Sequence, residues 1–237
     1  MCSSGIRSLV LGALWLVGGV AFAGEADAEG FTSLFNGKDL AGWDGDAKLW
    51  FVKDGAIIGK TTPENKTSGT YLICKQQIPD NFELHAAFKL VSGNSGIHYR
   101  TRELPNWQVA GYQADMDYDN QYTGIVYEVG GRAILVALGE KVAADATGKK
   151  QVVGSVGEPA TIKAATKKGE WNEYVILARG NHFIQKINGV TTAEFTDEKC
   201  PKSGIIAFQL HPGPPMEVQF KDVRVKELKD TTPPPAR

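Results

Sequence analysis

Apolar and polar residues alternate with a period of two along much of this 237-residue chain. The alternation is clearest over residues 82–90, 206–210 and 216–220. Because successive side chains of a β-strand point to opposite faces, this pattern is typical of strands that are buried on one face only. No segment shows a convincing 3.6-residue period, so we expect an almost all-β fold.

Turn-forming residues separate the expected strands. Asp54-Gly55 and Asn188-Gly189 stand at the ends of apolar segments, and both dipeptides favour the positive φ angles of tight hairpin turns. The segment 212–215 (PGPP) cannot form a strand, and residues 140–170 are expected to form a long excursion with short strands. Many short strands joined by such turns indicate a sandwich or jelly roll, whereas a propeller or solenoid would show a repeat.

Both ends of the chain are expected to lie outside the folded domain. Arg7, the apolar run 9–20 and the small residues at 21–23 have the organisation of a signal peptide, so residues 1–23 are predicted to be removed. The alternative is a retained N-terminal anchor. Residues 24–29 form a short N-terminal segment, and the Pro-rich tail 229–237 is expected to be disordered. We therefore expect an exported protein, periplasmic or extracellular, with no membrane span after signal cleavage.

Charge and cysteine content narrow the range of partners. The formal net charge is −1 and the sequence has no basic block, so it offers no electrostatic footprint for nucleic acid or acidic membranes. A neutral small molecule or polymer is the expected partner. Cys74 and Cys200 follow the signal peptide, and the sequence leaves open whether they form a disulfide or two buried thiols. Zinc binding is disfavoured because CxxC and HxxxH spacings are absent.

One expected strand, residues 111–117, carries a polar stripe. Side chains two residues apart share a face, so Gln113, Asp115 and Asp117 should project together at intervals of about 7 Å. The residues between them are expected to point into the core. If this protein has a chemical function, the stripe and its neighbours are the place where we expect it.

The neighbouring strands add charges of both signs. In the preceding strand, His98, Arg100 and Arg102 are expected to form a cationic row beside the acidic one. The next strand adds a third carboxylate, Glu128, with Arg132 just beyond it.

Two interpretations of this polar surface stay open. Cross-strand ion pairs on a solvated face would explain the charges. Arg, His, Asp and amide side chains also make directional hydrogen bonds that suit sugar hydroxyls. The nearby aromatic residues Trp107, Tyr112 and Tyr127 could stack on a pyranose ring or belong to the core.

The sequence also resembles a known family over about residues 30–228, in order and as one domain. Its opening segment, 30–43, is similar to the start of the 3-keto-disaccharide hydrolase domain, long described as a domain of unknown function. The similarity continues through the segments 50–55 (WFVKDG), 94–97 (NSGI), 111–115 (GYQAD), 169–172 (GEWN), 187–189 (ING) and 204–211 (GIIAFQLH).

The resemblance implies a concanavalin A-like jelly-roll β-sandwich with a sugar groove on its concave sheet. It also implies an exported bacterial enzyme that acts on 3-keto-glycosides or disaccharides, as a lyase, a hydratase or both. A C3 ketone acidifies the C2 proton, so a base can remove it and the enolate can expel the C1 aglycone. Water then adds to the resulting glycal, and the net outcome is hydrolysis. Such a site needs a general base, a proton donor and stabilisation of the enolate.

Position and chemistry suggest the site residues. Asp115, Glu128 and His98 are the acid–base candidates, and Arg100 and Arg132 are candidates for stabilising the enolate. Expected substrate contacts are Asn94, Tyr112, Gln113, Tyr127, Arg132, Gln209 and His211. A divalent cation at Asp115 and Asp117 is a further hypothesis, with Glu128 nearby, and no organic cofactor is expected.

One departure from the family pattern bears on the mechanism. Many relatives read Gly-Tyr-Glu-x-Gln where this chain has Gly-Tyr-Gln-Ala-Asp at 111–115, which moves the carboxylate two positions along the same face. A laminarinase-type retaining glycosidase would need a carboxylate at the first of these positions, where Gln113 cannot act as nucleophile. The remaining alternative to the enzyme is a non-catalytic carbohydrate-binding jelly-roll module.

Overall fold

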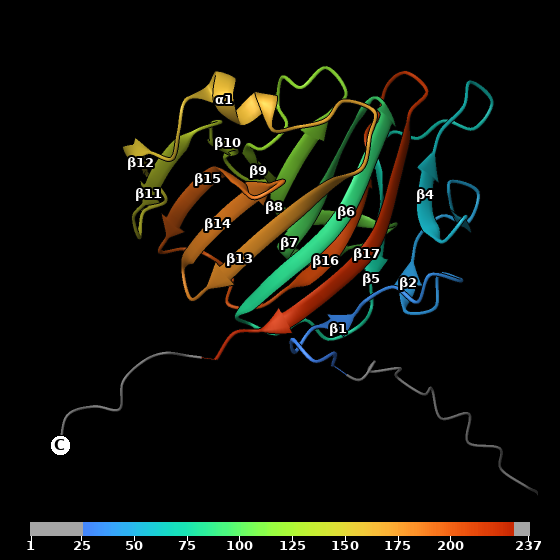
Figure 1. Cartoon of the computed structure of the whole chain (residues 1–237), viewed down its shortest axis with the longest axis horizontal. Coiled ribbons are helices and arrows are strands. Elements are labelled where there is room, and N and C mark those ends of the chain that lie inside the picture. The colour runs from blue at the N-terminus through green and yellow to red at the C-terminus, as the bar shows by residue number, and fades with distance from the viewer. Residues whose placement is uncertain (1–25, 230–237) are drawn as a thin grey trace, which may run out of the picture.

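The computed structural model describes residues 26–229 (Figure 1). Two β-sheets pack face to face, and the strands of one cross behind those of the other in this view. The predicted signal peptide, residues 1–23, and residues 230–237 of the predicted tail lie outside the described residues. Within the described part of the chain, no helix is both long and apolar enough to cross a bilayer.

The larger sheet has ten strands and is mostly antiparallel. β11 and β15 form its parallel pair, and β1 (Thr32–Ser33) pairs with β17 beside the main path. The strand order is β12 (Lys150–Ser155), β11 (Glu140–Ala144), β15 (Val190–Asp197), β14 (His182–Ile187), β13 (Asn172–Arg179), β6 (Phe82–Ser92), β17 (Glu217–Glu227), β4 (Ala56–Lys60) and β3 (Trp50–Lys53).

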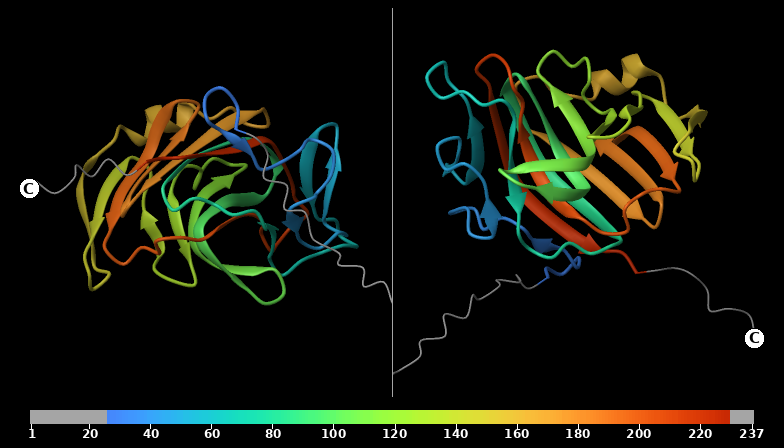
Figure 2. Two further views of the ribbon diagram at one scale, coloured as in Figure 1. Left: turned by 90° about the horizontal axis from the view of Figure 1, so that it is seen from below. Right: turned by 180° about the vertical axis from the view of Figure 1, so that it is seen from behind.

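The smaller sheet has seven strands and carries the polar stripe. Its order is β10 (Ala133–Val136), β9 (Val126–Val129), β8 (Gln108–Asp117), β7 (Asn94–Leu104), β16 (Ile205–Leu210), β5 (Thr70–Cys74) and β2 (Trp43–Asp44). The view from behind places this sheet in front (Figure 2). The predicted all-β, concanavalin A-like jelly-roll β-sandwich is therefore confirmed.

Aromatic side chains fill the space between the two sheets. Phe208 of the smaller sheet stacks on Phe220 of the larger one, with ring centroids 3.8 Å apart. Phe183 and Phe195 stack at 4.6 Å on neighbouring strands of the larger sheet. Such stacked pairs contribute about 0.5–1.5 kcal/mol beyond the area they bury. The core is thus fixed by rings contributed from both layers.

The local predictions about turns are confirmed. Asp54-Gly55 joins β3 to β4 and Asn188-Gly189 joins β14 to β15, and all four residues have positive φ angles. The stretch 140–170 contains β11, β12 and one short helix, α1 (Pro159–Ala164). Cys74 and Cys200, whose state the sequence left open, are free thiols.

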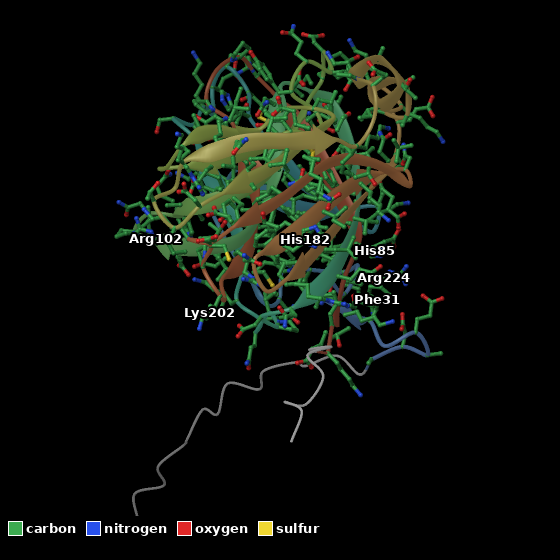
Figure 3. The ribbon with its side chains drawn as sticks, turned by 90° about the vertical axis from the view of Figure 1, so that its left-hand side faces the viewer. Phe31, His85, Arg102, His182, Lys202 and Arg224 are labelled. Atoms are coloured by element: carbon green, nitrogen blue, oxygen red, sulfur yellow. The ribbon has the colours of Figure 1, made fainter. Side chains whose placement is uncertain are left out.

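A β-bulge interrupts the ladder between β7 and β8. The register shifts between Tyr99 and Arg102, and Arg100 has a φ of 49°. The bulge turns the Arg100 side chain into the interior, where its guanidinium lies 5.4 Å from the centre of the Phe183 ring. Arg102 remains at the surface (Figure 3). The expected row of His98, Arg100 and Arg102 is therefore wrong, because the extra residue reverses the alternation at that point.

Two glycines make room for the bulge. A Cβ on Gly111, whose φ is 146°, would come within 2.8 Å of the Thr101 Cα. A Cβ on Gly204, in the neighbouring chain segment, would come within 2.5 Å of the Arg100 carbonyl carbon. The hairpin beyond the bulge folds over β5, where the Tyr71 amide donates to the Trp107 carbonyl and the Gln108 side chain donates to the Gly69 carbonyl.

We predict that Gly111→Ala lowers the free energy of unfolding by about 1–3 kcal/mol, because the substitution combines an unfavourable φ with a backbone clash. Urea denaturation of the purified variant measures this difference. Gly154→Ala is the matched control, since a Cβ there has only an ordinary contact with Lys141 at 3.7 Å. Equal stability of the two variants would contradict the role given to Gly111.

Candidate functional site

A groove of about 480 Å³ crosses the outer face of the smaller sheet. Side chains of six strands and of three loops line it. The lining residues are Ser68, Gly69, Tyr71, Asn94, Gln108, Gln113, Asp115, Tyr122, Ile125, Tyr127, Val129, Ile134, Gln209, His211 and Pro212. This volume is within the range of about 300–1,000 Å³ that is typical of small-molecule sites.

Asp115 is the buried carboxyl group of the groove. Its Oδ1 accepts a hydrogen bond from Asn94 Nδ2 at 3.0 Å, and its Oδ2 accepts one from Gln113 Nε2 at 2.9 Å. Only 5% of the residue is exposed. Burial raises the pKa of Asp115 to about 7, although the two amide donors favour the ionised form. The group can therefore take up and release a proton near neutral pH.

Gly96 allows Gln113 to reach Asp115. The two strands pair so that Gly96 lies opposite Asp115 and His98 lies opposite Gln113. A Cβ on Gly96 would lie 2.5 Å from Gln113 Cγ, so the Gln113 side chain occupies the space that the glycine leaves. The sequence Asn94-Ser95-Gly96 thus supplies both an amide donor to Asp115 and the room for the second one.

Tyr71 and Gln209 form the other polar part of the floor. They are paired across β5 and β16, and Gln209 Nε2 donates to the Tyr71 hydroxyl oxygen at 3.3 Å. The hydroxyl proton of Tyr71 is therefore free for another acceptor. Burial raises the pKa of Tyr71, which keeps this proton in place near neutral pH.

Buried polar atoms without a hydrogen-bond partner gather beneath the groove. Within the described residues ten such side-chain atoms occur, and five of them belong to Asn94, His98, Gln113 and Gln209 on β7, β8 and β16. An unpaired buried polar group costs about 1–3 kcal/mol, so a concentration of them marks a place where stability is given up. Such concentrations are expected at ligand sites.

Six of the predicted site residues lie together in this groove. They are Asn94, Gln113, Asp115, Tyr127, Gln209 and His211. Their convergence follows from the strand order, which places β9, β8, β7 and β16 side by side.

Three predicted site residues do not line the groove because their side chains are buried. Arg100 donates to the backbone carbonyls of Pro201 and Asp80 at one end of the interior. Tyr112 is fully in the core, where its hydroxyl donates to Asp197 at 2.6 Å, so it offers no surface to a sugar. His98 faces the groove side of the sheet but is completely buried under the Tyr71 ring, with centroids 4.8 Å apart. Burial lowers the pKa of His98 to about 3, so its ring is neutral.

Glu128 and Arg132 are paired with each other rather than directed at the groove. Arg132 Nε donates to Glu128, and an Arg132 terminal nitrogen donates to the buried carboxylate of Asp197. These contacts raise the pKa of Arg132 against the effect of burial and lower that of Asp197. The network joins β9 to β15 of the other sheet, and neither residue lines the groove.

The residues proposed for a cation do not form a ligand set. The Asp117 carboxylate accepts the backbone N–H groups of Gln121, Tyr122 and Thr123 and so holds the loop after β8. Both Asp115 oxygens accept amide hydrogens. Among residues 26–229 no group of three His, Cys, Asp or Glu side chains is placed to hold a metal ion.

Sequence reasoning missed several groove residues. Tyr71 lies on β5, whose sequence TYLIC does not alternate between polar and apolar residues because all five are buried. The sequence therefore does not show which side chains of β5 point to the outer face. Tyr122 lies in the loop that Asp117 holds, and it is 48% exposed. Ile134 lies on the short strand β10, opposite Tyr127. That these residues lie in one groove is visible only once the sheet order is known.

A second, larger hollow of about 730 Å³ lies on the outer face of the ten-stranded sheet. Phe31 and Arg224 line it, and they lie together with His85 in Figure 3. Arg224 lies over the Phe31 ring at 4.5 Å and is 3.6 Å from the Asp27 carboxylate. Surface ion pairs of this kind explain the charges on that face without a ligand.

Comparison with known proteins agrees with this architecture. A model of the 3-keto-alpha-glucoside-1,2-lyase-like domain matches residues 30–226. The chain belongs to this family. A search of curated proteins found no match.

Three solved structures illustrate the fold of this 3-keto-alpha-glucoside-1,2-lyase-like domain. A Parabacteroides distasonis protein, provisionally assigned as a glycosyl hydrolase, is 24% identical, with a TM-score of 0.57, over 85% of this chain and 95% of its own. Carbohydrate-binding module CBM66 of Bacillus subtilis is 11% identical, with a TM-score of 0.52, over 78% and 96%. A Bacillus subtilis protein of unknown function with a galectin-like fold is 11% identical, with a TM-score of 0.53, over 79% and 90%. At these identities the likeness concerns the fold, and family membership supports a carbohydrate-active role.

We predict that the ionisation of Asp115 destabilises the folded domain. Its pKa rises from an ordinary 3.8 to about 7 on folding, so the folded state binds the Asp115 proton more tightly than the unfolded state does. The stability gained from this proton is complete below pH 4 and is lost as pH rises towards 7. Relative to Asp115→Asn, the wild type should lose about 3 kcal/mol of unfolding free energy between pH 5 and pH 8. Urea denaturation of both proteins at the two pH values measures the difference. Parallel pH dependence would refute the raised pKa.

Proposed function

We propose that this protein cleaves glycosides that are already oxidised at C3, by elimination across C1–C2 followed by addition of water. The proposal rests on one observation above all: a buried carboxyl with a pKa of about 7 lies in a sugar-sized groove among amide side chains. Family membership supports the substrate class.

Asp115 acts as the general base in the first step. Its carboxylate takes the C2 proton, and the electron pair of that C–H bond forms the C2–C3 double bond of an enolate. The enolate then restores the C3 ketone, forms the C1–C2 double bond and breaks the bond from C1 to the aglycone oxygen. The proton now on Asp115 passes to that oxygen, so the aglycone leaves as an alcohol. A pKa near 7 suits both transfers.

The same group serves the second step. Asp115, ionised again, takes a proton from water, and the resulting hydroxide adds to C1 of the 2-hydroxy-3-keto-glycal. The new enolate receives the proton at C2 from Asp115, which gives the free 3-keto sugar. The Asp115 carboxyl group thus moves one proton from C2 to the aglycone oxygen in the first step and one proton from water to C2 in the second. The sum of the two steps is hydrolysis.

Tyr71 supplies hydrogen bonding to the enolate oxygen in this scheme. Its hydroxyl accepts from Gln209 and keeps its own proton for an acceptor in the groove. A neutral phenol of this kind stabilises developing negative charge without a fixed cation. Arg100 and Arg132, which the sequence suggested for this role, do not line the groove.

A carbohydrate-binding module is the second candidate. The tyrosines at 71, 122 and 127 that line the groove suit sugar stacking whether or not a reaction follows. Incubation with a 3-keto-glucoside distinguishes the two functions: the enzyme releases the aglycone and the 3-keto sugar, whereas a binding module releases neither.

We predict that Asp115→Asn lowers kcat by at least about 10²-fold, because an amide cannot accept the C2 proton. In the wild type, kcat/KM should rise with pH and level off above an apparent pKa near 7, since the base must be ionised. Aglycone release between pH 5 and pH 9 measures both effects. Glu173→Gln, on β13 of the opposite sheet, is the control carboxylate and should keep the wild-type kcat. Wild-type turnover by Asp115→Asn would remove Asp115 from the mechanism.

We also predict that Tyr71→Phe lowers kcat by about 10²-fold with a smaller change in KM, because removal of a single donor to a developing oxyanion has effects of this size. Steady-state kinetics on the same 3-keto-glucoside separates kcat from KM. A rise in KM alone would instead show that Tyr71 binds the ground state and the transition state equally and gives the enolate no extra stabilisation.

A further inference from the structure

The groove is divided by strand order into two halves of different polarity. β8, which carries Asp115, lies between β7 and β9 in the sheet. On the β7 side, the strands β7, β16 and β5 contribute Asn94, Gln209 and Tyr71. All of these present amide or hydroxyl groups. The boundary between the halves therefore lies at the base itself.

On the other side of β8 the lining is apolar. β9 contributes Tyr127 and Val129, β10 contributes Ile134, and Ile125 immediately precedes β9. Ile134 is opposite Tyr127 in the ladder, so these side chains form one continuous surface. We call these four residues the apolar wall.

The apolar wall is open to solvent in part. Ile134 is 39% exposed, and Tyr122, at the adjacent rim, is 48% exposed. Of the seven large apolar residues that are exposed among residues 26–229, two thus line this one groove. Apolar surface that is left uncovered beside a polar floor is a feature of ligand sites.

We propose that the apolar wall holds the aglycone, and that the preferred substrates carry a hydrophobic leaving group such as an aromatic or cycloaliphatic alcohol. This inference rests on the proposed function. The C2 proton taken by Asp115 and the C1–oxygen bond that breaks are on adjacent carbons, so the cleaved bond lies at the boundary between the halves. The sugar hydroxyls then match the polar half, and the aglycone extends over β9 and β10.

A hydrophilic aglycone fits this half less well. The wall offers one hydroxyl, that of Tyr127, to the several hydroxyl groups of a second sugar, and those left without partners lose the hydrogen bonds that they make in water. Among the described residues no Lys or Arg side chain lines the groove, so an anionic aglycone would meet Asp115 without a compensating cation. A neutral apolar group instead covers Ile134 and gains from the area removed from water.

The test compares two substrates whose leaving groups are equally difficult to expel. Methyl and cyclohexyl 3-keto-glucosides of the same anomer both release simple alcohols, so their kcat/KM ratio reports contact with the aglycone. We expect the wild type to favour the cyclohexyl compound about tenfold. Ile134→Ser should reduce this preference to about threefold or less. A ratio near one in the wild type, or an unchanged ratio in Ile134→Ser, would overturn the proposal.

Val91→Ser is the matched control. Val91 is 38% exposed, as Ile134 is 39% exposed, but it lies on β6 of the opposite sheet. This variant should keep the wild-type ratio. A fall in the ratio equal to that of Ile134→Ser would show a general effect of removing surface apolar groups and would overturn the assignment to the wall.

A second measurement separates this proposal from the proposed function. If neither 3-keto-glucoside is cleaved, the enzymatic function fails, and binding of the unoxidised methyl and cyclohexyl glucosides can be compared by calorimetry. Tighter binding of the cyclohexyl compound that is lost in Ile134→Ser supports the apolar wall as part of a binding module. Equal binding of the two compounds overturns it.

Discussion

The groove depends on the β-bulge at Arg100 and Thr101 of β7. Without it, Arg100 would follow His98 on the outer face, and the hairpin formed by β7 and β8 would continue in the plane of the sheet. The bulge sends the guanidinium to buried carbonyls between the layers, and it lets the hairpin curl over β5. That curl covers the outer face of β5, so Tyr71 is held at the groove floor and His98 is sealed beneath it.

The site also shows how burial and hydrogen bonding oppose each other at one carboxyl. Two amide donors favour the ionised form of Asp115, while the loss of water disfavours it more strongly. Around it, several amide oxygens and the His98 ring lack partners within the protein. Folding alone would be better served by an apolar floor with no such groups. The arrangement is therefore understandable as one that serves a ligand at the expense of stability.

The sequence predicts this fold well because its signals are local. Period-two alternation, Asp54-Gly55 and Asn188-Gly189 each depend on a few adjacent residues, and the structure confirms them. The shared face of Gln113 and Asp115 follows from the same rule. Arg100 could not be placed, because the bulge depends on Gly111 of β8 and on the distant Gly204, whose packing against β7 is not visible in the local pattern. Tyr71 and Ile134 were missed since only the order of strands in the sheet brings them beside Asp115.

Among the described residues no Lys or Arg lines the groove, which is consistent with the proposed role of Asp115 as a general base. A cation near Asp115 would stabilise its carboxylate and lower its pKa, so the group would be a weaker base for a carbon-bound proton. The two arginines that the sequence suggested are instead engaged with backbone carbonyls or with Glu128 and Asp197. In the proposed reaction, the enolate would be stabilised by neutral donors, among which Tyr71 is the candidate. A high pKa at the base and a neutral oxyanion donor are thus two consequences of the same choice of residues.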